Sequence, residues 1–159
     1  YQEAWDRMLA VNPHFSKRVA TLAAGGLESP LDCIGVPYPD LVTFSEDDDD
    51  ALVYNFAKAL DRQVGNYSKA DPGTAGYAAN KQMFEWTIPY HPAAVEYYKE
   101  AGVWSDALQA HTDNLYARRE VLAQAWKQME GKSGDNFAEE WLKVRAEALT
   151  AAGQPVYFN

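Results

Sequence analysis

The sequence contains little that would direct it to nucleic acid or into a bilayer. Only 14 Lys and Arg residues stand against 23 Asp and Glu, which gives a formal net charge of −9. A field of this sign repels phosphate backbones and anionic lipid headgroups. Charged residues also interrupt every apolar stretch well before the roughly 20 residues that a membrane-spanning helix requires. We therefore expect a chain that neither binds nucleic acid nor is embedded in a membrane.

Residues that hold metals or act as nucleophiles are equally sparse. Cys33 is the single cysteine, so no intrachain disulfide is possible and the redox compartment cannot be inferred. The histidines His14, His91 and His111 lie far apart without the spacing of metal ligands. We expect no metal, no cofactor and no enzymatic activity. An enzyme remains the third hypothesis, because a histidine could still meet an acid or a nucleophile in space.

An acidic run, residues 46–50, follows Ser45 and precedes a helical apolar pattern. Four consecutive aspartates suggest calcium, but the alternating spacing and central glycine of an EF-hand loop are missing. Acidic residues in a first helical turn are favoured by the helix dipole. The run therefore predicts a helix start rather than a calcium site.

The length and composition predict one domain with a sizeable core, since 47% of the 159 residues are hydrophobic and 13% aromatic. The chain opens at Tyr1 rather than at a methionine followed by basic and apolar segments. We therefore expect a trimmed or partial polypeptide whose export signal has been removed or lies outside it.

Helical spacing of apolar residues recurs along most of the chain. It predicts a short helix over residues 5–9, further helices over 52–60, 92–101, 105–129 and 137–148, and a weaker one over 75–84. Residues 15–31 show no clean helical period and are expected to be extended chain or loop. The segment Leu41–Phe44, entered through Tyr38-Pro39, has the β-branched and aromatic residues of a buried strand. Many helices with few strands would suit half of a larger α/β protein.

Five groups of residues then occur in a characteristic order between about residues 12 and 126. They are Tyr38-Pro39 leading into Leu41-Val42-Thr43; Leu52-Val53-Tyr54 with Lys58-Ala59; Phe84-Glu85-Trp86 with Ile88-Pro89-Tyr90-His91-Pro92; Tyr97-Tyr98-Lys99-Glu100-Ala101-Gly102-Val103-Trp104; and Ala110-His111 with Arg118-Arg119-Glu120-Val121-Leu122. In this order they resemble the C-terminal half of the TAXI family of receptors, which serve TRAP (tripartite ATP-independent periplasmic) transporters. Ala93 stands where many members are expected to have glycine.

The resemblance implies a helix-rich α/β fold, the C-terminal half of a two-lobed, type II-like periplasmic binding protein. Residues 1–45 would belong to an α/β lobe with its crossover or hinge strand. Residues 46–159 would form a helical portion packed on the lobes. Full members are about twice this length, so an N-terminal half would supply much of the cleft.

The resemblance also implies a periplasmic receptor that captures a small organic acid or amino-acid-like anion. The receptor would deliver this carboxylate to the membrane subunits of a TRAP permease, which an ion gradient drives. The alternative is a free-standing helical module that recruits another protein through apolar faces near Leu115 or Trp141. The stripe Leu108, Leu115, Leu122 and Met129 is expected to pack within the protein rather than in a dimer.

Four residues are candidates for contact with the solute: Tyr38, Trp86, Tyr90 and His91. Tyr38 enters the expected crossover strand, where it would either touch the solute or pack at the hinge. Trp86 and Tyr90 flank a proline turn, a place where aromatic rings more often belong to the core. His91 could equally cap the helix that starts at Pro92. Arg118 and Arg119 match a carboxylate chemically, but are expected to be solvated or paired with Glu120.

Overall fold

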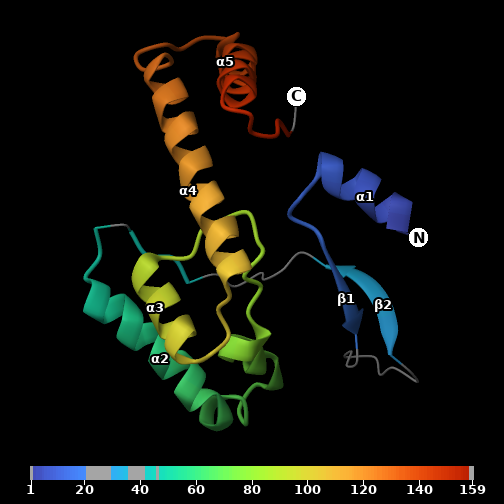
Figure 1. Cartoon of the computed structure of the whole chain (residues 1–159), viewed down its shortest axis with the longest axis vertical. Coiled ribbons are helices and arrows are strands. Elements are labelled where there is room, and N and C mark those ends of the chain that lie inside the picture. The colour runs from blue at the N-terminus through green and yellow to red at the C-terminus, as the bar shows by residue number, and fades with distance from the viewer. Residues whose placement is uncertain (1, 21–29, 36–41, 46, 158–159) are drawn as a thin grey trace. The chain divides into compact units, whose positions relative to one another are not determined.

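The computed structural model describes residues 2–20, 30–35, 42–45 and 47–157. In this part of the chain it contains five α-helices, two short 3-10 helices and two strands (Figure 1). Contacts divide the chain into two compact units, Tyr1–Pro39 with Asn114–Asn159, and Asp40–Asp113. The long helix α4 (Asp106–Lys127) begins in the second unit and ends in the first.

The first unit opens with helix α1 (Gln2–Val11) and a two-stranded ribbon. Strands β1 (Ser16–Ala20) and β2 (Leu31–Gly35) are antiparallel, with Ser16 opposite Gly35 and Ala20 opposite Leu31. The extended chain predicted around residues 15–20 is thus a paired strand. The short helix predicted over residues 5–9 is confirmed as α1, which ends two residues before Pro13, because a proline cannot continue the ladder of helical hydrogen bonds.

The rest of the first unit consists of the end of α4, helix α5 and the C-terminal segment that follows α5. Helix α5 (Phe137–Ala151) follows a turn in which Gly131 and Gly134 have positive φ. After α5 the chain turns back, and two arginines donate to its carbonyl oxygens. Arg118 of α4 bonds to the oxygen of Pro155, and Arg145 of α5 bonds to that of Tyr157, each at 2.5 Å.

The second unit is built on helices α2 (Asp50–Tyr67) and α3 (Pro92–Glu100), which lie side by side (Figure 1). Between them the chain forms the 3-10 helices η1 (Pro72–Tyr77) and η2 (Ala79–Lys81). The acidic run starts α2 as predicted, because the carboxylate of Asp49 accepts the backbone N–H of Leu52 at 2.9 Å.

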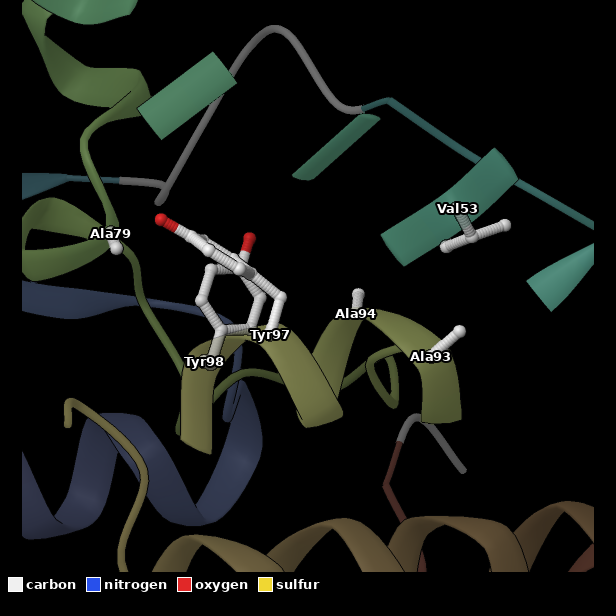
Figure 2. Packing of buried hydrophobic residues seen from close by; sticks show 6 residues of the cluster. All are labelled: Val53, Ala79, Ala93, Ala94, Tyr97 and Tyr98. Carbon is white, nitrogen blue, oxygen red and sulfur yellow. The ribbon is translucent and has the colours of Figure 1, made fainter. Parts of the chain in front are cut away.

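Small side chains on α3 allow this pairing. Ala93 and Ala94 are buried and point from α3 toward Val53 of α2 (Figure 2). Tyr97 and Tyr98, one turn later, are also buried and complete the core with Ala79 of η2. Gly102 then ends the segment at φ 73°, as predicted, since a glycine adopts this left-handed conformation without strain.

The expected α/β two-lobed binding-protein fold is wrong for this structure. Such a fold requires parallel strands joined by helical crossovers. The described residues contain a single sheet, and its two strands are antiparallel neighbours in the sequence. Helices form most of the remainder. The boundary expected between residues 45 and 46 depends on the same resemblance and stays a prediction.

The strand predicted at Leu41–Phe44 is also missing from the residues that can be described. Leu41 lies outside them, and Val42–Phe44 have no regular structure. A strand needs a neighbour to pair its backbone, and here Phe44 instead packs its ring against the core of the second unit. The weaker helix predicted over residues 75–84 is replaced by the 3-10 helices, which start at the Asp71 cap.

Candidate functional site

Three of the four predicted contact residues lie in the second unit, on the loop between η2 and α3 and at its junction with α3. They are Trp86, Tyr90 and His91, and all three are partly buried. Tyr38 lies outside the described residues. The structure therefore describes one segment of the predicted site, residues 86–91. Its three candidate side chains have different environments.

His91 caps helix α3 through one ring nitrogen. Its Nδ1 accepts the backbone N–H of Ala93 at 3.2 Å, so this nitrogen carries no proton. A neutral imidazole must then hold its proton on Nε2, which makes Nε2 a hydrogen-bond donor. This Nε2 is buried and has no hydrogen-bond partner among the described residues. The capping alternative for His91 is confirmed, and the cap leaves the second ring nitrogen available as a donor.

The backbone of Trp86 makes a hydrogen bond that fixes its position. Its carbonyl oxygen lies 2.7 Å from Nε2 of His111 on α4, and because a carbonyl only accepts, His111 donates. The indole Nε1–H of Trp86 is buried, and within the described part of the chain it has no acceptor. Leaving a buried donor unpaired costs about 1–3 kcal/mol. Trp86 and His91 thus each present an unpaired ring N–H on one short segment.

Tyr90 belongs to an aromatic cluster that we define as Phe84, Tyr90, Tyr98 and Trp104. Every pair of these rings is in contact, with centroids 4.9–6.5 Å apart. The Tyr90 hydroxyl donates to the carbonyl oxygen of Met83 at 3.3 Å. Tyr90 therefore anchors the loop that carries Trp86 and His91, which agrees with the expectation that aromatic residues here serve the core first.

Two carboxylates of this unit were missed by the sequence analysis. Asp61 of α2 accepts the backbone N–H of Ala79 at 2.7 Å and the hydroxyl of Tyr97, so it joins α2, η2 and α3. Burial and the hydrogen bond to Asp61 raise the pKa of Tyr97. The helix predicted from periodicity ended at residue 60, one position before Asp61, and periodicity could not identify partners 18 and 36 residues away.

The second carboxylate, Glu100, lies at the end of α3 and accepts hydrogen bonds from two residues of α2. The hydroxyl of Tyr54 is one donor, and Nζ of Lys58 at 2.9 Å is the other. These bonds, with that from Tyr54 the larger, lower the pKa of Glu100 below its ordinary value of 4.5. The hydrogen bond of Lys58 to Glu100, followed by its bond to the Tyr54 hydroxyl, raises the pKa of Lys58.

Replacing Glu100 with glutamine should therefore change how stability depends on pH. A lowered pKa in the folded state means that the stabilisation is present above about pH 4.5 and is lost as the pH falls through the lower folded value. The Tm difference between the parent and Glu100→Gln is expected to be positive at neutral pH and to shrink toward zero in acid. Thermal melts from neutral pH to pH 3 measure it, with Glu96→Gln on the same helix as the control. An equal difference at every pH would contradict the assignment.

The acidic run does not form a metal site in the described part of the chain. The carboxylate of Asp48 accepts the backbone N–H of Ser45, and that of Asp49 caps α2. No group of three His, Cys, Asp or Glu residues suited to a metal ion occurs among the residues described. Within the same residues, no helix combines the length and apolar character needed to cross a bilayer.

Comparison with known proteins does not assign the chain to a family. No family model, no curated protein and no solved structure matches it. Function must therefore be inferred from the residues themselves.

Proposed function

We propose that this chain is part of a periplasmic solute receptor that binds a small organic acid or amino-acid-like anion and delivers it to a TRAP-type permease. The observation that carries the proposal is the pair of unpaired ring N–H groups, Trp86 Nε1 and His91 Nε2. Buried polar groups are nearly always paired in folded proteins, and exceptions call for an explanation. A carboxylate of a bound solute supplies the acceptors that these donors lack.

The chemistry of the two groups suits an anion that must also be released. Both are N–H donors on neutral rings, and hydrogen bonds from such donors to a carboxylate are charge-assisted. Each contributes about 1.5–3 kcal/mol. Two such bonds would orient the carboxylate without a buried ion pair, whose desolvation is costly. These two donors would contact only the carboxylate, and other residues would contact the rest of the solute.

The motifs that resemble TAXI receptors support the proposal in a second way. Four of the five groups are joined by contacts within the second unit, including the bond from His111 to the Trp86 carbonyl oxygen. The Tyr54 and Tyr97 rings are 5.9 Å apart, Lys58 bonds to Glu100, and Phe84 packs on Trp104. Residues spread over about a third of the chain therefore form one packed unit that includes the proposed donors. The proposal does not use the two-lobed architecture.

The experiment is a calorimetric titration of the chain with a panel of short mono- and dicarboxylates and amino acids. His91→Asp keeps an oxygen to cap α3 but removes the donor and adds a negative charge. His91→Asn keeps both the cap and an N–H donor, so it is the matched control. Binding is expected to weaken by about tenfold or more in His91→Asp, and less in His91→Asn.

Trp86→Phe provides an independent check, because it removes the indole N–H but retains an aromatic ring and the carbonyl that accepts from His111. Affinity is again expected to fall by about tenfold. If no member of the panel binds, or if all three variants bind like the parent, the receptor proposal is wrong.

The alternative, a helical interaction module, is favoured by a different observation in the first unit. Trp126 is 45% exposed, and its ring contacts Phe137 and Trp141 of α5 at 5.9 and 5.1 Å. Leu142, beside them in the sequence, is 40% exposed. Exposed tryptophans are frequent energetic centres of protein interfaces. This alternative becomes the leading one if the solute panel gives no binding.

A further inference from the structure

A second surface, on the outer side of helix α2, has no role in the proposed receptor site. Two large apolar side chains of this helix are exposed there, Leu52 by 56% and Phe56 by 37%. Leu52 and Phe56 are four residues apart and so lie on one face of the helix. Burying such side chains against a partner would stabilise a complex, because apolar surface would leave water.

This apolar patch, Leu52 and Phe56, is held in place by contacts within the second unit. The Phe56 ring meets the Phe44 ring edge-on at 5.4 Å, and Phe44 packs against the core. Asp49 caps the first turn of helix α2, and Asp61, further along the same helix, bonds to the backbone of Ala79. A surface held in this way loses little conformational entropy on binding, which favours recognition.

The charge beside the patch determines which partner would fit. Asp47, Asp48, Asp49 and Asp50 lie in the sequence between Val42 and Leu52. The cations of α2, Lys58 and Arg62, lie further along and face Glu100 at 2.9 and 3.6 Å. The edge next to the patch is therefore acidic. A second copy would bring the same acidic turn against it and be repelled, whereas a basic partner would be attracted.

We propose that the apolar patch and the turn Asp47–Asp50 form a docking surface for a basic amphipathic segment of another protein. Apolar side chains of that segment would cover Leu52 and Phe56, and its lysines or arginines would face the aspartates. Neutralising exposed charges speeds association and sets orientation more than it adds affinity. The proposal is independent of solute binding, because it uses neither Trp86 nor His91.

The test uses a labelled helical peptide made of leucine and lysine, with a leucine and glutamate peptide of the same pattern as its control. Anisotropy measures binding to the whole chain. The lysine peptide should bind, more weakly at higher salt, and the glutamate peptide should not. Leu52→Gln should weaken binding by about tenfold. Val11→Gln, which removes an exposed apolar side chain of α1, should not.

Asp47→Asn with Asp50→Asn tests the acidic edge, since neither side chain supplies the cap of α2. This pair should weaken binding about threefold or more and reduce its salt dependence. The amide resonances of Leu52 and Phe56 and the methyl resonances of Leu52 should shift on titration. The proposal is overturned if Leu52→Gln and Val11→Gln bind alike, if both peptides bind equally, or if the chain associates with itself through this face.

Discussion

Replacing Asp61 with alanine is expected to lower the free energy of unfolding by about 2–4 kcal/mol. The carboxylate accepts the Ala79 N–H and the Tyr97 hydroxyl, and both Ala79 and Tyr97 are buried, at 3% and 0% exposure. The substitution therefore leaves two donors without an acceptor at the place where α2, η2 and α3 meet. Each unsatisfied donor costs about 1–3 kcal/mol, more than the net value of the bond itself.

Urea titration followed by circular dichroism measures this loss. Asp113→Ala is the matched control, because Asp113 is exposed and its carboxylate accepts a hydrogen bond from the side chain of Gln109 on the same helix. It should change stability by less than about 0.5 kcal/mol. Tyr97→Phe should cost about 1 kcal/mol. The double substitution should cost less than the sum of the two, because both remove the same bond. Equal effects of Asp61→Ala and Asp113→Ala would contradict this role.

The helices could be predicted from the sequence because their signals are local. Asp49 caps a helix within three residues, Pro92 fits a first turn, and Gly102 adopts a conformation that other residues avoid. These effects depend on residues that are close together in the chain, so they can be recognised in a single sequence. Asp61 and Glu100 were missed because their partners lie on other elements, and nothing in the order of residues identifies such pairs.

The fold class was predicted wrongly for a related reason. Leu41–Phe44 has the composition of a buried strand, but composition cannot supply a neighbouring strand. Phe44 is instead used as a side chain that covers the core and supports Phe56. Strand β1 lies where the sequence indicated only extended chain or loop, and β2 lies almost entirely beyond that segment. Strand pairing is decided at a distance along the chain, whereas helix capping is decided nearby.

The predicted site shows the same division between local and distant information. A proline after His91 indicated a cap, and the cap is present. That His91 Nε2 and Trp86 Nε1 are both buried without acceptors follows from how the loop packs, which sequence spacing does not specify. Tyr90 was chosen for its neighbours in the sequence, and its ring contacts are those of a core residue. Of the three, His91 and Trp86 remain the residues whose polar groups a solute would satisfy.

Leu149→Ala is expected to have a similarly large effect in the first unit, about 2–5 kcal/mol. Leu149 of α5 is 0% exposed, so its truncation removes apolar burial and leaves a cavity that its surroundings fill only in part. Its carbonyl also accepts the N–H of Gln154 at 2.8 Å, at the point where the chain turns back after α5. Loss of packing here should therefore loosen the C-terminal segment as well as the helix.

Leu142→Ala is the control, because the same residue type on the same helix is 40% exposed. It should cost less than about 1 kcal/mol, since most of the deleted side chain already contacts water. Thermal melts give the difference in stability, and amide exchange locates it. Exchange should rise in α5 and at Gln154 in Leu149→Ala, and hardly change in Leu142→Ala. Similar losses from both substitutions would mean that α5 does not use Leu149 to hold its buried face, and that another residue of the unit has this function.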